Sequence, residues 1–322
     1  MNVSTRLTSL RKNEMVSATH DPVLYKEILQ ALKPETNRLY VDGTLGAGGH
    51  SLGILEACAP AGKLLGLDVD PQALALARET LAPHEPRSIL LQRSYTMLEA
   101  TLKEIDWALV NGIVLDLGAS SMQFDTPERG FSFRDDAPLD MRFDPTRAQN
   151  AADIVNTYSE TELAEIIFRY GEERASRQIA KAIVRERPIR TTGELASVIK
   201  SVMPRKKGMR VHPATRTFQA LRIAVNDEMG AIKSVLPQAM RVLAPGGRLA
   251  IISFHSLEDR LVKQYFRQES RDCLCPPKQP VCTCGHKALL KEINRKPIFP
   301  SDEETARNPR ARSARLRVAE KL

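Results

Sequence analysis

The stretch YVDGTLGAGGHSLGIL, residues 40–55, joins a short apolar run that ends in an acid to a turn with four glycines and the start of a helix. Glycines stand between a strand and a helix where backbone N–H groups and the helix N-terminus must lie close to a ligand. Asp68 follows Gly49 by about 20 residues, at the end of the next apolar run, where a carboxylate can bind ribose hydroxyls. This pattern predicts a site for an adenosine-containing cofactor.

Two kinds of cofactor fit such a turn, a dinucleotide and S-adenosylmethionine. The glycines of GTLGAGGH, residues 43–50, do not keep the dinucleotide spacing G-x-G-x-x-G. Asp42, just before them, would repel a pyrophosphate and would suit a cationic methionine group. The pattern therefore favours S-adenosylmethionine, and a glycine-rich turn without a ligand is the plain alternative.

Strand-like and helix-like patterns alternate in the first third of the chain, which predicts βαβ units and a parallel sheet. Asp70 and Pro71 have the residue types of an N-cap and a first helical position. The predicted strands are residues 38–42, 63–70, 88–92 and 111–118, and the predicted helices are 51–58 and 70–82.

The pattern changes to helices alone over residues 126–226, and after them a helix, a Pro-Gly-Gly turn and a buried strand return. We therefore expect one α/β domain interrupted by an inserted all-helical domain, with two further strands near the C-terminus. The expected parts are a disordered extension over 1–19, the α/β domain over 20–125 and 227–322, the helical domain over 126–226, and late strands over 288–298 and 314–319.

Composition is that of a folded enzyme with a polyanionic partner. The chain has 322 residues, 42% of them hydrophobic, a net charge of +8 and a pI near 9.3. No apolar run approaches the ~20 residues that span a bilayer, and the first residues lack the apolar core of a signal peptide. We expect a cytoplasmic protein that does not bind membranes.

Three long polar blocks resemble one family closely, namely residues 116–144, 212–228 and 253–263, which begin DLGASSMQF, HPATRTFQ and SFHSLEDR. Together with residues 20–32 and 308–321, they resemble the MraW family, also called RsmH, of bacterial methyltransferases that act on cytosine N4 of small-subunit ribosomal RNA. The resemblance covers the chain from about His20 to its end. A generic methyltransferase would share the glycine-rich turn but not these blocks.

The resemblance implies a class I methyltransferase fold and N4-methylation of one cytidine of 16S rRNA at the decoding centre, within the small ribosomal subunit. Tyr95 stands where the family usually carries Phe, and either ring can stack on adenine. The cofactor contacts that the resemblance assigns are Gly48, Gly49, His50, Asp68, Tyr95, Asp116 and Gln123.

The reaction needs a group that orients the amine and accepts its proton, because the lone pair of cytosine N4 is delocalised into the ring. Many amino-methyltransferases use an Asn/Asp-Pro-Pro-aromatic turn after the fourth strand, but this chain has DLGASS there. Asp116 is the best-placed acceptor, and it could instead serve the cofactor alone. His255 is the second catalytic candidate, or else a structural group at a helix start, and Ser120 and Ser121 could hold the base or only fix their loop.

Charged segments outside this turn have both functional and structural interpretations. PRKKGMR, residues 204–210, and RNPRARSARLR, residues 307–317, could contact RNA phosphates, or could form solvated surfaces. Asp140 and Arg142 are expected to form an ion pair within a loop.

Four of the five cysteines fall in CLCPPKQPVCTCGH, residues 273–286, as two Cys-x-Cys pairs. In a reducing cytosol such a set favours metal binding over disulfides, although zinc ribbons usually have Cys-x-x-Cys. A structural zinc held by Cys273, Cys275, Cys282 and Cys284 is one hypothesis, and a surface loop with free thiols is the other.

Two other functions remain open from the sequence. A non-catalytic nucleic-acid-binding protein with a basic, Cys-rich tail would bind no cofactor. An NAD-dependent oxidoreductase would bind a dinucleotide, which the glycine spacing disfavours.

Overall fold

A seven-stranded sheet is the centre of the computed structural model, which describes residues 22–203, 212–276, 279 and 281–322. The strand order is β3-β2-β1-β4-β5-β7-β6; β1 to β5 are parallel, and β7 is antiparallel to both of its neighbours. This is the strand arrangement of class I methyltransferases, so the α/β prediction is confirmed. The strands are β1 Leu39–Asp42, β2 Lys63–Asp68, β3 Ser88–Gln92, β4 Val110–Asp116, β5 Leu243–Ser253, β6 Leu290–Glu292 and β7 Arg315–Lys321.

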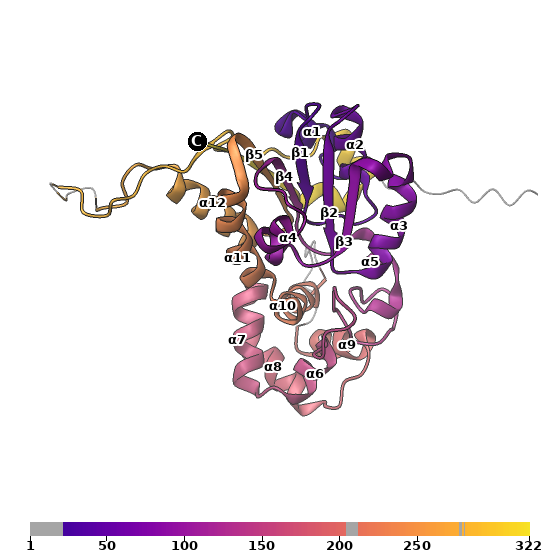
Figure 1. Ribbon diagram of the computed structural model, residues 1–322. Helices are drawn as coiled ribbons and strands as arrows, with labels where there is room; N and C mark the ends of the chain where they lie inside the picture. The colour runs from indigo at the N-terminus through magenta and orange to yellow at the C-terminus, as the bar shows by residue number, and fades with distance from the viewer. Residues whose placement is uncertain (1–21, 204–211, 277–278, 280) are drawn as a thin grey trace, which may run out of the picture.

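Helices cover both faces of the sheet (Figure 1). Neighbouring strand residues point to opposite faces: Val41 joins one buried apolar cluster and Tyr40 the other. One cluster lies under α4 Leu98–Glu104, α11 Glu228–Val242 and α12 Ser256–Glu269. The other lies under α1 Tyr25–Leu32, α2 Gly49–Ala57 and α3 Pro71–Leu81.

The four strands and two helices predicted in the first third begin and end within two residues of the predicted positions, whereas α1 and α4 were not predicted. Asp70 caps α3 as predicted: its carboxylate accepts a hydrogen bond from the Gln72 N–H at 3.0 Å, and Pro71 takes the first helical position.

Between β4 and α11 the chain forms helices with their own apolar core, seen at the bottom of Figure 1. Capping boxes at Ser120, Asn150, Ser159 and Thr191 start four of them. Within the described residues of this segment, the sheet-type pairing is an isolated bridge between Pro138 and Thr191. The helices are α5 Ser121–Asp125, α6 Ala151–Thr157, α7 Glu160–Gly171, α8 Ser176–Arg185, α9 Thr192–Val202 and α10 Thr215–Asn226.

Two predictions for the last third were wrong in detail. The strand expected over 288–298 is β6 and an isolated bridge between Ile298 and Leu316. Between them the Asn294 side chain takes the N–H of Val318 and the carbonyl of Leu316 and so interrupts the ladder. The expected Pro-Gly-Gly turn lies inside β5, where the pairing with β4 shifts register.

The extension predicted over 1–19 lies outside the described residues. No helix in the described part of the chain has both the length and the apolar character needed to cross a bilayer.

Candidate active site

A cleft of about 2090 Å³ opens where the carboxyl ends of the parallel strands face the helical segment. Its lining comes from the glycine-rich turn, from the ends of β2, β4 and β5, and from α10. Ligands bind at this edge of open α/β sheets. The cleft is therefore the candidate active site.

The glycine-rich turn forms one wall of the cleft. Gly46 has φ +52°, and a Cβ placed on it would meet, within 4 Å, only the Thr44 carbonyl oxygen, so its backbone faces open space. Behind the turn, the carboxylate of Asp42 accepts hydrogen bonds from the Ser51 hydroxyl at 2.7 Å and the Thr44 N–H at 3.1 Å. Burial raises the pKa of Asp42 to about 6.

Asp68 lies in the cleft at the end of β2. One carboxylate oxygen accepts the Gly46 N–H at 2.8 Å, and the other accepts the Asp70 N–H at 2.9 Å. Burial is the largest cause that raises its pKa to about 6. Each oxygen keeps a second lone pair, which suits a pair of ribose hydroxyls.

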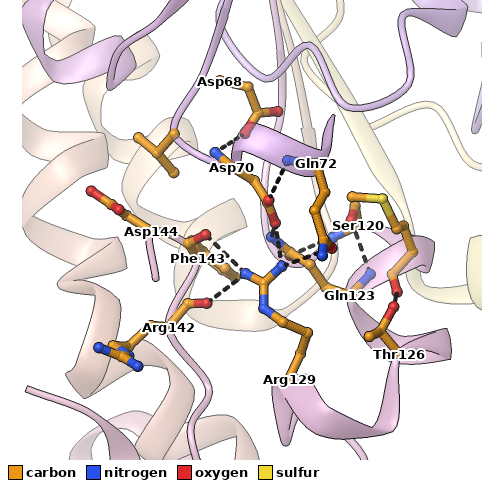
Figure 2. A network of polar contacts seen from close by, with 12 residues as sticks. Asp68, Asp70, Gln72, Ser120, Gln123, Thr126, Arg129, Arg142, Phe143 and Asp144 are labelled. Carbon is orange, nitrogen blue, oxygen red and sulfur yellow. Dashed lines mark hydrogen bonds and ion pairs between the residues drawn. The ribbon is translucent and has the colours of Figure 1, made fainter. Parts of the chain in front are cut away.

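Asp70 connects this wall to the helical segment, as Figure 2 shows. Its Oδ2 accepts a hydrogen bond from Gln123 Nε2 at 2.9 Å and an ion pair from Arg129 at 2.6 Å. The other nitrogen of Arg129 donates to the carbonyls of Arg142 and Phe143. Both polar ends of Gln123 are used inside the protein, because its Oε1 accepts the Ser120 N–H.

Asn226 fastens the opposite end of the helical segment. Its Oδ1 accepts the Phe143 N–H at 2.8 Å, and its Nδ2 donates to the Met141 carbonyl at 2.7 Å. Asn226 lies at the end of α10, just before the chain returns to the sheet. Both connections of the segment are thus tied to the loop that contains Met141 and Phe143.

His50 and Tyr95 also line the cleft. The Nε2 of His50 donates to the Val23 carbonyl at 2.9 Å, and burial lowers the pKa of the imidazole to about 4, so the ring is neutral at pH 7. Its side chain thereby holds the segment before α1. Tyr95 is partly buried, and burial raises the pKa of its hydroxyl.

Asp116 ends β4 with a carboxylate that faces the cleft. Its N–H donates to Thr44 Oγ1 at 2.6 Å, while its Oδ1 is buried and has no hydrogen-bond partner in the described structure. Burial raises the pKa of Asp116 well above its ordinary value, and the charges of Asp42 and Glu258 raise it further. An unpartnered buried oxygen of this kind marks a position for a ligand donor.

His255 caps α12 at the edge of the cleft. Its Nδ1 accepts the Glu258 N–H at 3.4 Å, and its Nε2 lies 3.1 Å from Glu258 Oε1 without the alignment of a hydrogen bond. Burial opposes the charge of Glu258, but His255 and Arg222 bring its pKa below the ordinary value. Both ring nitrogens of His255 therefore face Glu258.

Three charged residues at this site were missed in the sequence, namely Arg222, Glu228 and Glu258. Arg222 pairs with both oxygens of Glu228, at 2.7 and 2.8 Å. Gly118, with φ +94°, brings the DLGASS turn against them, since a Cβ there would lie 3.7 Å from Arg222 and 3.9 Å from Glu258. All three lie in the polar blocks that carry the family resemblance, which was the available signal.

Glu228, His255 and Glu258 lie close enough together to be considered as metal ligands. Both oxygens of Glu228, however, already accept hydrogen bonds from the Arg222 guanidinium. The group is therefore a buried ion-pair network with its own cation.

The remaining predicted residues have structural contacts. Ser120 caps α5, and Asp140 and Arg142 form the expected ion pair at 2.7 Å. In the basic stretch 307–317, Arg310 pairs with Asp125, and the buried Arg317 pairs with Asp259 at 2.6 Å. The cluster 204–210 lies outside the described residues. The four cysteines of 273–284 lie together, away from the cleft lining.

Comparison with known proteins agrees with this geometry. Residues 17–322 match the model of the MraW methylase family. The chain is 52% identical over 308 residues to "Ribosomal RNA small subunit methyltransferase H" of Dehalococcoides mccartyi, with 96% of this chain and 88% of that protein covered. Proteins of the same name from Heliobacterium mobile, 51% identical over 94% and 99% of the two chains, and Thermomicrobium roseum, 50% identical over 97% of each, are also similar. The chain therefore belongs to the MraW methylase family.

Proposed function

We propose that this chain transfers a methyl group from S-adenosylmethionine to the exocyclic N4 of one cytidine of 16S rRNA, at the decoding centre of the small ribosomal subunit. The observation that carries the proposal is the buried, unpartnered Oδ1 of Asp116 in the cleft. With that substrate, the protein acts in the cytoplasm.

The residues of the glycine-rich wall fit the proposed cofactor, which supplies an activated methyl group on a sulfonium cation. Gly49 and His50 start α2 in the cleft lining, Gly48 is the N-cap directly before them, and Asp68 offers two acceptors for a ribose. Asp42, Asp116 and Glu258 are three buried acids whose mutual repulsion a cationic ligand would relieve. Tyr95 and Gln123 complete the proposed contacts from the cleft lining.

Asp116 is the proposed catalytic residue. When it is ionised, its Oδ1 can accept a hydrogen bond from an exocyclic amine, orient the nitrogen, and take up the proton that the nitrogen loses. A cation bound beside it would favour the ionised form, against the burial that raises its pKa. This assignment needs no Asn/Asp-Pro-Pro turn.

For His255 we propose a positioning role. Its ring faces Glu258, and Glu258 lies beside Gly118 in the DLGASS turn. The imidazole would then hold the Glu258 carboxylate, which helps to shape the site. The direct catalytic role predicted for His255 stays a prediction.

The helical segment, residues 126–226, is the proposed RNA-binding domain. Phe131, Phe133, Phe143 and Phe218 line the cleft on its side. Phe131 and Phe143 stack at 5.6 Å between ring centroids, and Phe133 meets Phe218 edge to face at 4.8 Å. Aromatic rings are suitable surfaces for a base that has left its stack.

The test is methyl transfer to small ribosomal subunits that lack the modification, with the 16S rRNA digested to nucleosides and analysed by mass spectrometry. We expect N4-methylcytidine at one position, and we expect assembled subunits to be better substrates than naked RNA. A methyl group on another base, or none on either substrate, would contradict the proposal. Calorimetry with S-adenosylmethionine, S-adenosylhomocysteine and NAD separates it from a non-catalytic binder or an oxidoreductase.

A further inference from the structure

The second cluster of reactive side chains lies far from the cleft, in the segment between α12 and β6. We call residues 273–284 the cysteine loop. Figure 1 shows that the chain after α12 projects away from the body of the molecule before it returns to the sheet. Cys273 and Cys275 lie on the outgoing arm, and Cys282 and Cys284 lie on the returning arm.

The four sulfur atoms converge although nothing in the surrounding fold packs them together. All four lie within 4.8 Å of one another. The Cys273–Cys282, Cys282–Cys284 and Cys273–Cys284 separations between Sγ atoms are 3.5, 3.6 and 3.9 Å. Sulfurs bound at ~2.3 Å to one tetrahedral metal ion are about 3.8 Å apart, whereas a disulfide holds them at about 2.05 Å. The distances match a shared metal ion.

Backbone N–H groups point at these sulfurs. Leu274 donates to Cys284 Sγ at 3.3 Å, Cys275 to Cys273 Sγ at 3.4 Å, and Thr283 to Cys275 Sγ at 3.4 Å. Outer hydrogen bonds of this kind orient ligands and favour the thiolate form that binds metal.

Little else constrains the described residues of the cysteine loop, apart from hydrogen bonds that join Gln279 to Pro276, Val281 and Thr283. Its described residues include no helix, no strand and no buried side chain. Its apolar side chains point outward, with Leu274 exposed by 39% and Val281 by 71%. Long loops without secondary structure need some local constraint to be ordered.

From these observations we propose that Cys273, Cys275, Cys282 and Cys284 bind one Zn²⁺, which links the two arms of the cysteine loop. Four thiolates in a tetrahedron are typical of structural zinc sites, which leave no open position for a substrate. His286 is outside the group of side chains that lie close enough together to share one ion. The zinc shapes the arm and takes no part in methyl transfer.

The experiment measures metal in the full-length protein purified without chelator, by elemental analysis and native mass spectrometry. We expect about one zinc per chain. The Cys282→Ser variant should lose most of it, and the Cys58→Ser variant should keep it, because Cys58 is buried at the C-cap of α2, outside the cluster. Cobalt substituted for zinc should give the intense visible bands of a tetrahedral thiolate site.

A second readout follows the shape of the loop and does not depend on activity. Tryptic cleavage at Arg271 and Lys287 should be slow in the zinc-loaded protein and fast after chelation, with no change in the rest of the digest. Less than a tenth of an equivalent of zinc, both as purified and after reconstitution under reducing conditions, would overturn the proposal. So would full zinc retention by Cys282→Ser, an iron centre, or a thiol titration that finds two disulfides. None of these outcomes depends on the methyltransferase reaction.

Discussion

The cleft and the cysteine loop both gather side chains that can carry negative charge, but the chain assembles them in opposite ways. Asp42, Asp68, Asp116 and Glu258 come from four segments spread over most of the sequence. Burial raises the pKa of the three aspartates, and charged neighbours that the fold brings close lower the pKa of Glu258. The four cysteines come from twelve consecutive residues, and three of them are exposed. A site built by the whole fold should respond strongly to single changes within it. A site built by local spacing should fail without disturbing the rest.

The largest effect is expected for Asp116→Asn. The amide has the shape of the carboxyl group but can neither take the amine proton nor carry charge, so turnover should fall about a thousandfold. Cofactor affinity should fall less than about tenfold, and stability should not fall, because the high pKa of Asp116 leaves the empty protein little charge to lose. Single-turnover methylation with bound cofactor is the measurement. Turnover at the wild-type rate would remove Asp116 from the chemistry.

Arg129→Met tests the link between the two walls of the cleft. Its guanidinium pairs with a fully buried Asp70, and its loss leaves that charge with only neutral donors. We expect the free energy of unfolding in urea to fall by about 3 kcal/mol. The control is Arg169→Met, which removes an exposed pair with Glu165 and should cost less than about 0.5 kcal/mol. Equal losses in the two variants would contradict the role of Asp70.

His50→Gln tests how burial sets charge in the cleft wall. The native imidazole has a pKa of about 4, below the ordinary 6.5, so below pH 6.5 the unfolded chain binds a proton that the native protein does not. This contribution to the free energy of unfolding is present above pH 6.5 and falls by about 1.4 kcal/mol per pH unit toward pH 4, about 3 kcal/mol in all. Urea unfolding at pH 7, 6 and 5 should show this slope in the wild type relative to the variant. Parallel curves would mean that His50 titrates normally.

Asp68→Ala should weaken S-adenosylmethionine binding by about 1.5–3 kcal/mol, since a ribose would lose a charged acceptor. Part of the loss would come from the turn itself, because Asp68 also accepts the Gly46 N–H. Calorimetry is the measurement, and Glu303→Ala, an exposed carboxylate on the cleft rim, is the control. An unchanged dissociation constant would remove Asp68 from the site.

The smallest effect is expected for Cys282→Ser on methylation of small subunits. The cysteine loop contributes no residue to the cleft lining, so the rate should change less than about twofold. A loss of methylation comparable to that of Asp68→Ala would mean that the loop contacts the substrate. The two sites would then differ in how the chain builds them but not in their importance for the reaction.

The same contrast explains what could be predicted from the sequence. The positions of Asp42, Asp68 and Asp116 in the site could be predicted because parallel strands bring their carboxyl ends to one edge of the sheet. The role of Asp70 as an N-cap could be predicted because a cap depends only on the neighbouring residues in the sequence. Two ion pairs could not be predicted, because the packing of the helical segment determines them: Arg222 with Glu228, and Arg129 with Asp70. The strand over 288–298 was predicted too long, because the pattern of residue types does not show that the Asn294 side chain takes the place of a backbone partner of β7.

The anchors at the two ends of the helical segment determine which molecule must move during recognition. Arg129 ties its beginning to the buried Asp70, and Arg222, near its end, pairs with Glu228 on α11, so a hinge at either connection would break a buried ion pair. The walls of the cleft are thus preorganised, and the target nucleotide has to leave its stack to enter. Unstacking takes a few kcal/mol and is easiest for a base that is already unpaired. For the cytidine substrate proposed above, the rigidity of the protein would act as a filter on RNA conformation that disfavours a paired base before any of its atoms is read.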